Sequence, residues 1–162
     1  LVAPSDEILM TTHLSYSVRF SLDEVPITGV KTSGVKGINL KEDDYVVSVN
    51  VISQQSTEDI MLITQRGSIK RMHLSEVEPG ARAKRGLVTL RELKTNPHRV
   101  FAVVLANKSE GLVVETVKGH QETIEVNSFR PTDRYSNGSF VIDTEKDGQL
   151  LRAWKKPVEQ ES

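Results

Sequence analysis

Arginine and lysine residues gather in the middle of this 162-residue sequence. Eight basic residues stand against three acidic ones between Thr64 and Lys94, whereas residues 1–63 hold four basic and nine acidic residues. A cationic stretch on an otherwise ordinary chain is typical of a polyanion-binding surface, because each phosphate contact releases condensed counterions. The alternative is a solvated, loop-rich face on which charges cluster by chance. The net charge of −1 argues against a protein coated in positive charge.

Residue types that could support catalysis or hold a metal do not converge in the sequence. The chain has no cysteine, which excludes disulfides, thiolate-ligated zinc, iron–sulfur clusters and thiol nucleophiles. The histidines form no HExxH or His-x-His pair, and they are His13, His73, His98 and His120. We interpret the acidic pairs Asp43-Asp44 and Glu58-Asp59 as exposed turns at strand starts. The sequence therefore predicts no catalytic residue, no metal site and no cofactor.

The chain repeats itself at an offset of 52 residues, and this repeat decides the fold class. Residues 8–25, 60–77 and 112–129 align without gaps, so that Thr12, Thr64 and Thr116 coincide. At the same offset the segment 86–90 falls on 138–142, and both begin with glycine. Recurrence at one fixed offset indicates duplication of a structural unit.

Each unit reads as four short strands. The β-branched runs 46–51 and 100–105 have strand length, and Ile60–Thr64 leads into a hairpin turn at Gly67, where a positive φ costs little. A third strand is expected over 69–74 and a fourth from Gly86. No long apolar stripe of helical period is present, and no apolar run approaches the roughly 18–20 residues that span a bilayer. The sequence predicts an all-β, propeller-like fold.

About three four-stranded units fit the length, and three units cannot close a ring. We expect an incomplete, open array with the first unit at 1–45, lacking its opening strand, and the second at 46–98. The third unit with a closing strand is expected over 99–156, and a flexible tail over 157–162. Because the chain begins at Leu1 and lacks a leader, we interpret it as a piece of a longer cytoplasmic protein.

Two stretches resemble a known family. Residues 59–71 combine an apolar strand, a Thr-x-x-Gly turn and a Lys-Arg pair, and they resemble the blade core of the C-terminal domains of bacterial gyrase and topoisomerase IV A subunits. Residues 86–99 are similar to topoisomerase IV A subunits of Gram-positive bacteria. The resemblance covers roughly Glu7 to Trp154.

The resemblance implies a β-pinwheel, in which propeller-shaped blades have a strand-swapped connectivity and DNA bends along a basic rim. The loop Pro79–Gly86 matches the position of the gyrase box, Gln-Arg-Arg-Gly-Gly-Arg-Gly, but does not contain it. That departure favours topoisomerase IV over gyrase. The pair Arg134-Tyr135 has the residue types with which these enzymes attack DNA, but it lies in an expected loop instead of a winged helix, so we predict no nucleophile here.

The resemblance and the repeat together predict a DNA-binding rim made of basic residues at matching positions of successive units. These residues are Lys31, Lys36, Arg66, Lys70, Arg71, Arg82, Lys84, Arg85, Arg91, Lys94, Arg130 and Arg134. Such contacts position a duplex but carry little sequence information.

The implied function is that of a non-catalytic domain of an ATP-dependent type IIA topoisomerase, holding duplex DNA for strand passage. The implied partners are duplex DNA, the ATPase B subunit and the remainder of the A subunit, with no membrane, in the bacterial cytoplasm at the nucleoid. The alternative is a propeller-type protein-interaction scaffold, which would bind its partner independently of salt.

Overall fold

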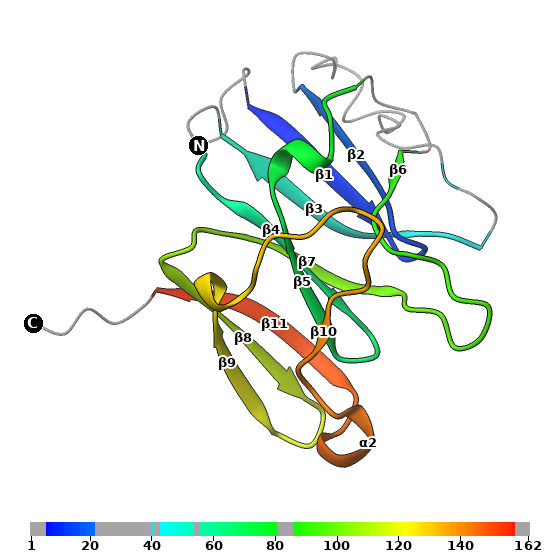
Figure 1. Cartoon of the computed structure of the whole chain (residues 1–162), viewed down its shortest axis with the longest axis vertical. Coiled ribbons are helices and arrows are strands. Elements are labelled where there is room, and N and C mark those ends of the chain that lie inside the picture. The colour runs from blue at the N-terminus through cyan, green and yellow to red at the C-terminus, as the bar shows by residue number, and fades with distance from the viewer. Residues whose placement is uncertain (1–5, 22–39, 41–42, 54–55, 81–85, 158–162) are drawn as a thin grey trace, which may run out of the picture.

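The computed structural model describes residues 6–21, 40, 43–53, 56–80 and 86–157 and consists of three antiparallel β-sheets stacked side by side (Figure 1). This confirms the all-β prediction, and the stack does not close into a ring or barrel over the described ranges. The strands are β1 (Glu7–Thr12), β2 (Tyr16–Ser21), β3 (Val46–Ile52), β4 (Asp59–Thr64), β5 (Ser68–Met72), β6 (Leu87–Val88), β7 (Val100–Ala106), β8 (Glu110–Thr116), β9 (Gln121–Glu125), β10 (Ser139–Phe140) and β11 (Leu150–Pro157). The short helical turns are η2 (Leu74–Glu76), η3 (Val126–Ser128) and α2 (Thr144–Asp147).

The strand order shows how the repeat builds each sheet. Sheet 1 has the order β3-β1-β2-β6, sheet 2 has β10-β5-β4-β7, and sheet 3 has β11-β8-β9. Each sheet is therefore built on one hairpin (β1–β2, β4–β5 or β8–β9), and a strand later in the chain pairs with the hairpin's first strand. In sheets 1 and 2 a two-residue strand from the next repeat pairs with the hairpin's second strand.

The sheets do not follow the contiguous units expected from the sequence. β3 and β6 both fall within the expected second unit, 46–98, yet both belong to sheet 1. Sheet 1 consequently has four strands, although its unit was expected to lack one. The physical reason is that the open edges of β1 and β2 carry unpaired backbone N–H and C=O groups, and segments later in the chain supply their partners.

Pro79 and Pro131 contact sheets 1 and 2 at equivalent points. Pro79 forms a parallel bridge with Arg19, and Pro131 forms the same bridge with Arg71, so the two contacts are one repeat apart. Each loop ends at a glycine with positive φ, Gly86 or Gly138, beyond which the swapped strand begins. The repeat thus brings Pro79 and Gly86 to sheet 1 as it brings Pro131 and Gly138 to sheet 2.

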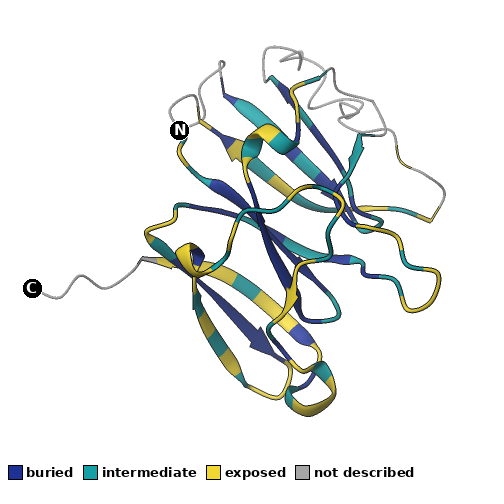
Figure 2. Cartoon of the chain, viewed as in Figure 1, coloured by how far each residue is buried: buried dark blue, intermediate teal, exposed yellow. Residues whose placement is uncertain are grey.

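Two apolar cores lie between the sheets. Sheets 1 and 2 meet through a cluster that includes Leu9, Leu62 and Met72, and sheets 2 and 3 meet through one that includes Ile63 and Leu112. β4 and β5 are buried along their whole length, whereas β9 alternates between half-buried and exposed residues (Figure 2). Sheet 2 is therefore the centre of the molecule, and positively charged side chains on β5 have no direct route to solvent.

Candidate nucleic-acid interface

Lys70 and Arg71, two of the predicted rim residues, lie inside the protein. Their exposed fractions are 2% and 9%, because β5 has sheets on both sides and is also crossed by the segment 131–138, hereafter the crossing loop (Figure 1). The sequence could not show this, since the covering loop comes from the next repeat. Both charges are engaged in internal contacts, so neither side chain is part of the surface described below.

Arg71 is held by a carboxylate and a carbonyl. Its Nε donates to Asp59 Oδ2 at 2.7 Å and its Nη1 to the Phe129 carbonyl at 3.0 Å. One repeat earlier, Arg19 pairs with Glu7 at 2.8 Å and donates to carbonyls around η2. Arg71 thus holds the segment after the third hairpin on sheet 2, and Arg19 holds the segment after the second hairpin on sheet 1. In both places the positive charge stabilises the fold.

Arg91 and Arg134 are brought together by contacts between two loops. The Arg91 backbone N–H donates to Asn137 Oδ1 at 3.0 Å, and Arg134 Nη1 donates to the Val88 carbonyl at 3.2 Å. The 89–99 loop and the crossing loop therefore form one surface between sheets 1 and 2. The predicted rim residues on this surface and directly before the crossing loop, hereafter the loop patch, are Arg91, Lys94, Arg130 and Arg134.

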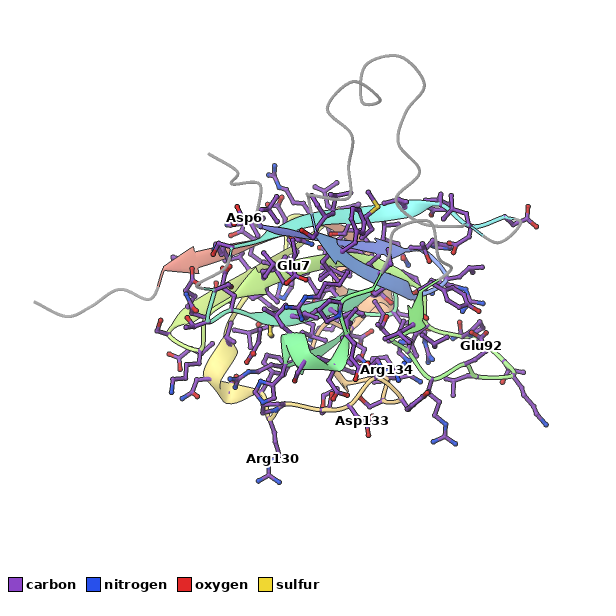
Figure 3. All side chains as sticks on the ribbon, turned by 90° about the horizontal axis from the view of Figure 1, so that it is seen from above. Asp6, Glu7, Glu92, Arg130, Asp133 and Arg134 are labelled. Carbon is purple, nitrogen blue, oxygen red and sulfur yellow. The ribbon has the colours of Figure 1, made fainter. Side chains whose placement is uncertain are left out.

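Three cations of the loop patch are exposed to a ligand. They are Arg91, Lys94 and Arg130, and Arg130 points away from the body of the protein (Figure 3). Arg134 is half-buried and its guanidinium lies 5.0 Å from the centre of the Tyr135 ring. The patch can thus offer exposed arginine and lysine side chains to phosphate groups from adjoining loops.

Acidic side chains near the loop patch reduce its net positive charge. Glu92 pairs with Arg99 at 3.1 Å, and Glu76 Oε1 accepts the Arg134 backbone N–H at 3.1 Å. Asp133 lies beside Arg134 along the same edge of the molecule as Arg130 (Figure 3). A surface of mixed charge binds a polyanion through individual contacts and is strongly screened by salt.

Arg66 stands next to the patch in a small cluster that the sequence did not reveal. Its Nη1 donates to the Asn96 carbonyl at 3.0 Å and lies 3.2 Å from His98 Nε2, and its guanidinium lies 5.2 Å from the centre of the Phe140 ring. Burial, and secondly the Arg66 charge, lower the pKa of His98 below its ordinary value. Phe140 is 62% exposed, and only its pairing in a two-residue swapped strand brings it here.

The remaining predicted contacts lie outside the described residues. These are Lys31, Lys36, Arg82, Lys84 and Arg85. The described residues on either side of 81–85 contact sheet 1, because the Gly80 N–H donates to the Arg19 carbonyl at 2.7 Å and Leu87 pairs with Ser17.

The described part of the chain offers no sign of a metal centre or a membrane-spanning helix. Within those ranges no three His, Asp or Glu side chains are grouped so that they could hold a metal ion. In the same ranges no helix combines the length and the apolar character that crossing a bilayer requires.

Comparison with known proteins identifies the family. The model described as DNA gyrase C-terminal domain, beta-propeller, matches residues 6–53 and 58–107, which is more than half of the chain. The A subunit of DNA topoisomerase 4 from Bacillus subtilis (strain 168) is 49% identical over 154 residues, covering 95% of this chain and 19% of that protein. The corresponding protein of Streptococcus pneumoniae serotype 4 is 37% identical over 168 residues, covering 94% of this chain and 20% of that protein. The chain thus spans about a fifth of the length of these relatives.

Solved structures agree with the sequence relatives. A crystal structure of the C-terminal domain of DNA topoisomerase IV superposes with a TM-score of 0.89 at 47% identity, covering 95% of this chain and 47% of that one. A DNA gyrase A C-terminal domain superposes at 0.78 with 17% identity, covering 98% of this chain and 51% of that one, a likeness that shows the fold alone. The chain belongs to the DNA gyrase A C-terminal domain family, and its sequence and fold match the C-terminal region of topoisomerase IV A subunits.

Proposed function

We propose that the chain is a non-catalytic domain of a type IIA topoisomerase that binds duplex DNA, and that the loop patch is one of its DNA-contacting surfaces. The observation that carries the proposal is the placement of exposed cations on loops that cross between neighbouring sheets. Arg91 and Arg130 come from different loops, which Asn137 joins through its contact with the Arg91 N–H. A duplex lying across the sheets would meet both loops at once.

The chemistry of the patch suits the DNA backbone. Arginine guanidinium groups bind phosphate oxygens bidentately, and lysine supplies a mobile point charge. Contacts of this kind fix the position of a duplex without reading bases, so sequence preference would arise from how easily the DNA bends. We infer that the domain holds a duplex segment for strand passage, which an ATP-hydrolysing B subunit carries out with the catalytic parts of the A subunit in the bacterial cytoplasm.

The test is an electrophoretic shift assay with long duplex DNA over a salt series. The variant R91Q/K94Q/R130Q removes three exposed charges from the loop patch. The matched control K108Q/K118Q/K156Q removes three exposed lysines elsewhere. We expect the patch variant to reduce the slope of log K against log salt by about one for each phosphate contact that it removes, and the control to leave the slope near the original value.

Equal losses of affinity in the two triple variants would show only a general charge effect and would contradict the assignment of DNA binding to the loop patch.

A second candidate, a protein-interaction scaffold, has one observation in its favour. Tyr45, Val49 and Val51 on and beside the edge strand β3 are 53%, 55% and 41% exposed, and such a row is suited to protein contact. Salt-insensitive capture of a protein partner, together with no retention of DNA, would favour that candidate.

A further inference from the structure

The Lys70 ammonium group sits in a cage of backbone carbonyls. Nζ donates to the carbonyls of Ser136, Arg134 and Asp133 at 2.8, 3.1 and 3.2 Å. A lysine ammonium has three N–H donors and no acceptor, so one donor is available for each of the three carbonyls. All three acceptors belong to the crossing loop, which the ammonium therefore binds at its middle.

Lys70 is the anchor on β5 that holds the middle of the crossing loop, since the other anchors on β5 lie toward the loop's ends, and Glu76 of η2 holds the Arg134 N–H from the other side at 3.1 Å. Near its start, the Thr132 N–H donates to the Arg71 carbonyl at 2.8 Å. Near its end, Ser68 Oγ donates to the Asn137 carbonyl and Gly138 takes a positive φ against β5. Without the ammonium, these three carbonyl oxygens would lie close together with no donor between them, which is unfavourable.

The equivalent position on sheet 1 shows what the lysine adds. Val18 stands one repeat before Lys70, and a pocket of about 360 Å³ lies there, lined in part by Val18, Pro79 and Gly86. On sheet 3 the matching residue is Glu122, which is half-buried and accepts from His120 at 2.8 Å. Among the described residues, only Lys70 places a buried ammonium against a loop that crosses its sheet.

We propose that Lys70 is a positioning residue that sets the conformation of the crossing loop and thereby places Arg130, which directly precedes that loop, for DNA contact. The inference about DNA rests on the proposed function, whereas the inference about the loop stands on the carbonyl cage. Lys70 itself touches no DNA, since only 2% of the residue is exposed.

The protonation state of Lys70 links the crossing loop to pH. Burial lowers the pKa of Lys70 to about 8, Arg134 acts in the same direction, and the Asp133 and Glu76 carboxylates act in the opposite one. Asp133 and Arg134 come from the crossing loop and Glu76 from η2, while the facing residue on β4 is the apolar Leu62. As the pH rises through about 8, the Lys70 ammonium loses a proton, and with it one donor and the positive charge. Its hydrogen bonds to the three carbonyls therefore weaken.

The experiment compares K70M with K108M in the 162-residue chain. Methionine keeps most of the lysine stem but cannot donate, and it removes the cost of burying a charge, so we expect K70M to fold. Lys108 is exposed in the turn between β7 and β8 and supplies a control for the loss of one charge. Hydrogen exchange of the backbone amides in 132–137 reports the loop, and the amides of β4 and β8 report the whole fold.

We expect K70M to raise the exchange rates of the loop amides by at least about tenfold with β4 and β8 unchanged, because charged hydrogen bonds are removed. DNA affinity of the original chain should fall more from about pH 7 to 9.5 than that of K70M, because only the original chain has the Lys70 proton to lose. K108M should behave like the original chain. Original loop protection in K70M would overturn the assignment of Lys70 to the loop.

The two proposals fail separately in this design. Faster exchange of the loop amides in K70M, combined with unchanged DNA affinity and the original pH profile, would overturn the placement of Arg130 by Lys70. Failure of the original chain to bind DNA at any salt concentration would refute the proposed function, and the exchange measurement would still decide the role of Lys70 in the loop.

Discussion

Arg71 and Asp59 show how a basic residue of this domain can serve the fold instead of a ligand. Their side chains are 10% and 12% exposed and meet at 2.7 Å, and Asp59 also pairs with His73 at 3.0 Å. Removing one partner of such a buried pair leaves the other charge uncompensated, whereas an exposed arginine can be removed at little cost.

The variant R71M should therefore lower the free energy of unfolding by about 3 kcal/mol in urea titrations, while R130M should change it by less than about 0.5 kcal/mol. The same two variants should show the reverse order in DNA binding when compared under conditions where both are folded. Comparable stability losses in R71M and R130M would refute the structural role of Arg71.

His98 gives the fold a dependence on acid. Its ring is buried, lies 2.9 Å from Thr64 Oγ1, and has a pKa below the ordinary value because of burial and the Arg66 charge. In the unfolded chain His98 takes up a proton at about pH 6.5, whereas in the folded chain it takes up a proton only at a lower pH. The contribution of His98 to stability is therefore complete above that pH and falls as the pH drops toward the lowered pKa.

The expected measurement is the urea midpoint between about pH 7.5 and 5. H98Q should flatten the decline seen in the original chain, and R66Q should flatten it in part because it removes the smaller cause of the shift. An unchanged decline in H98Q would show that other groups produce the acid sensitivity.

At the scale of elements, the sequence predicted strands better than it predicted their partners. The 52-residue offset located the hairpins because Thr64 and its equivalents sit at a fixed position of each turn, followed by a residue of positive φ at the position of Gly67. Pairing of β6 with β2 and of β10 with β5 joins segments from different repeats, and no local pattern encodes it. For the same reason Lys70 and Arg71 were expected on the surface, since the loop that covers them lies about one repeat further along the chain.

The glycine that ends each crossing segment is an element-scale requirement that can be tested. Gly138 has φ +73°, and a Cβ added there would overlap the Ile69 carbonyl. Gly119 has φ +86° but open space around it, so it isolates the cost of the backbone conformation. Gly80 has ordinary φ and open space.

We expect the loss of unfolding free energy to decrease in the order G138A, G119A, G80A, with G138A costing more than about 2 kcal/mol, G119A about 1 kcal/mol and G80A close to nothing in urea titrations. The larger loss in G138A would come from the swapped strand β10 moving away from β5. Equal losses in G138A and G119A would mean that the strand tolerates the shift.

At the scale of the whole molecule, a chain of net charge −1 can bind a polyanion only if its cations are placed on one side of the sheets. The repeat favours such a placement, because Pro79 and Pro131 contact successive sheets at equivalent points, Arg19 and Arg71. In the sequence, Arg82, Lys84 and Arg85 come between Gly80 and Gly86, and one repeat later Arg134 comes between Thr132 and Gly138.

If the loops of sheets 1 and 2 act together, about six phosphates are engaged and the slope of log K against log salt should be near −5. R82Q/K84Q/R85Q should then reduce the slope to about −2 to −3, and adding R91Q, K94Q and R130Q should bring it close to zero, because each substitution removes about one ion contact. We expect the effects of the two sets of substitutions on the slope to add, because they neutralise different residues. An unchanged slope in R82Q/K84Q/R85Q would mean that these three residues do not contact the bound duplex and that DNA follows another path over the domain.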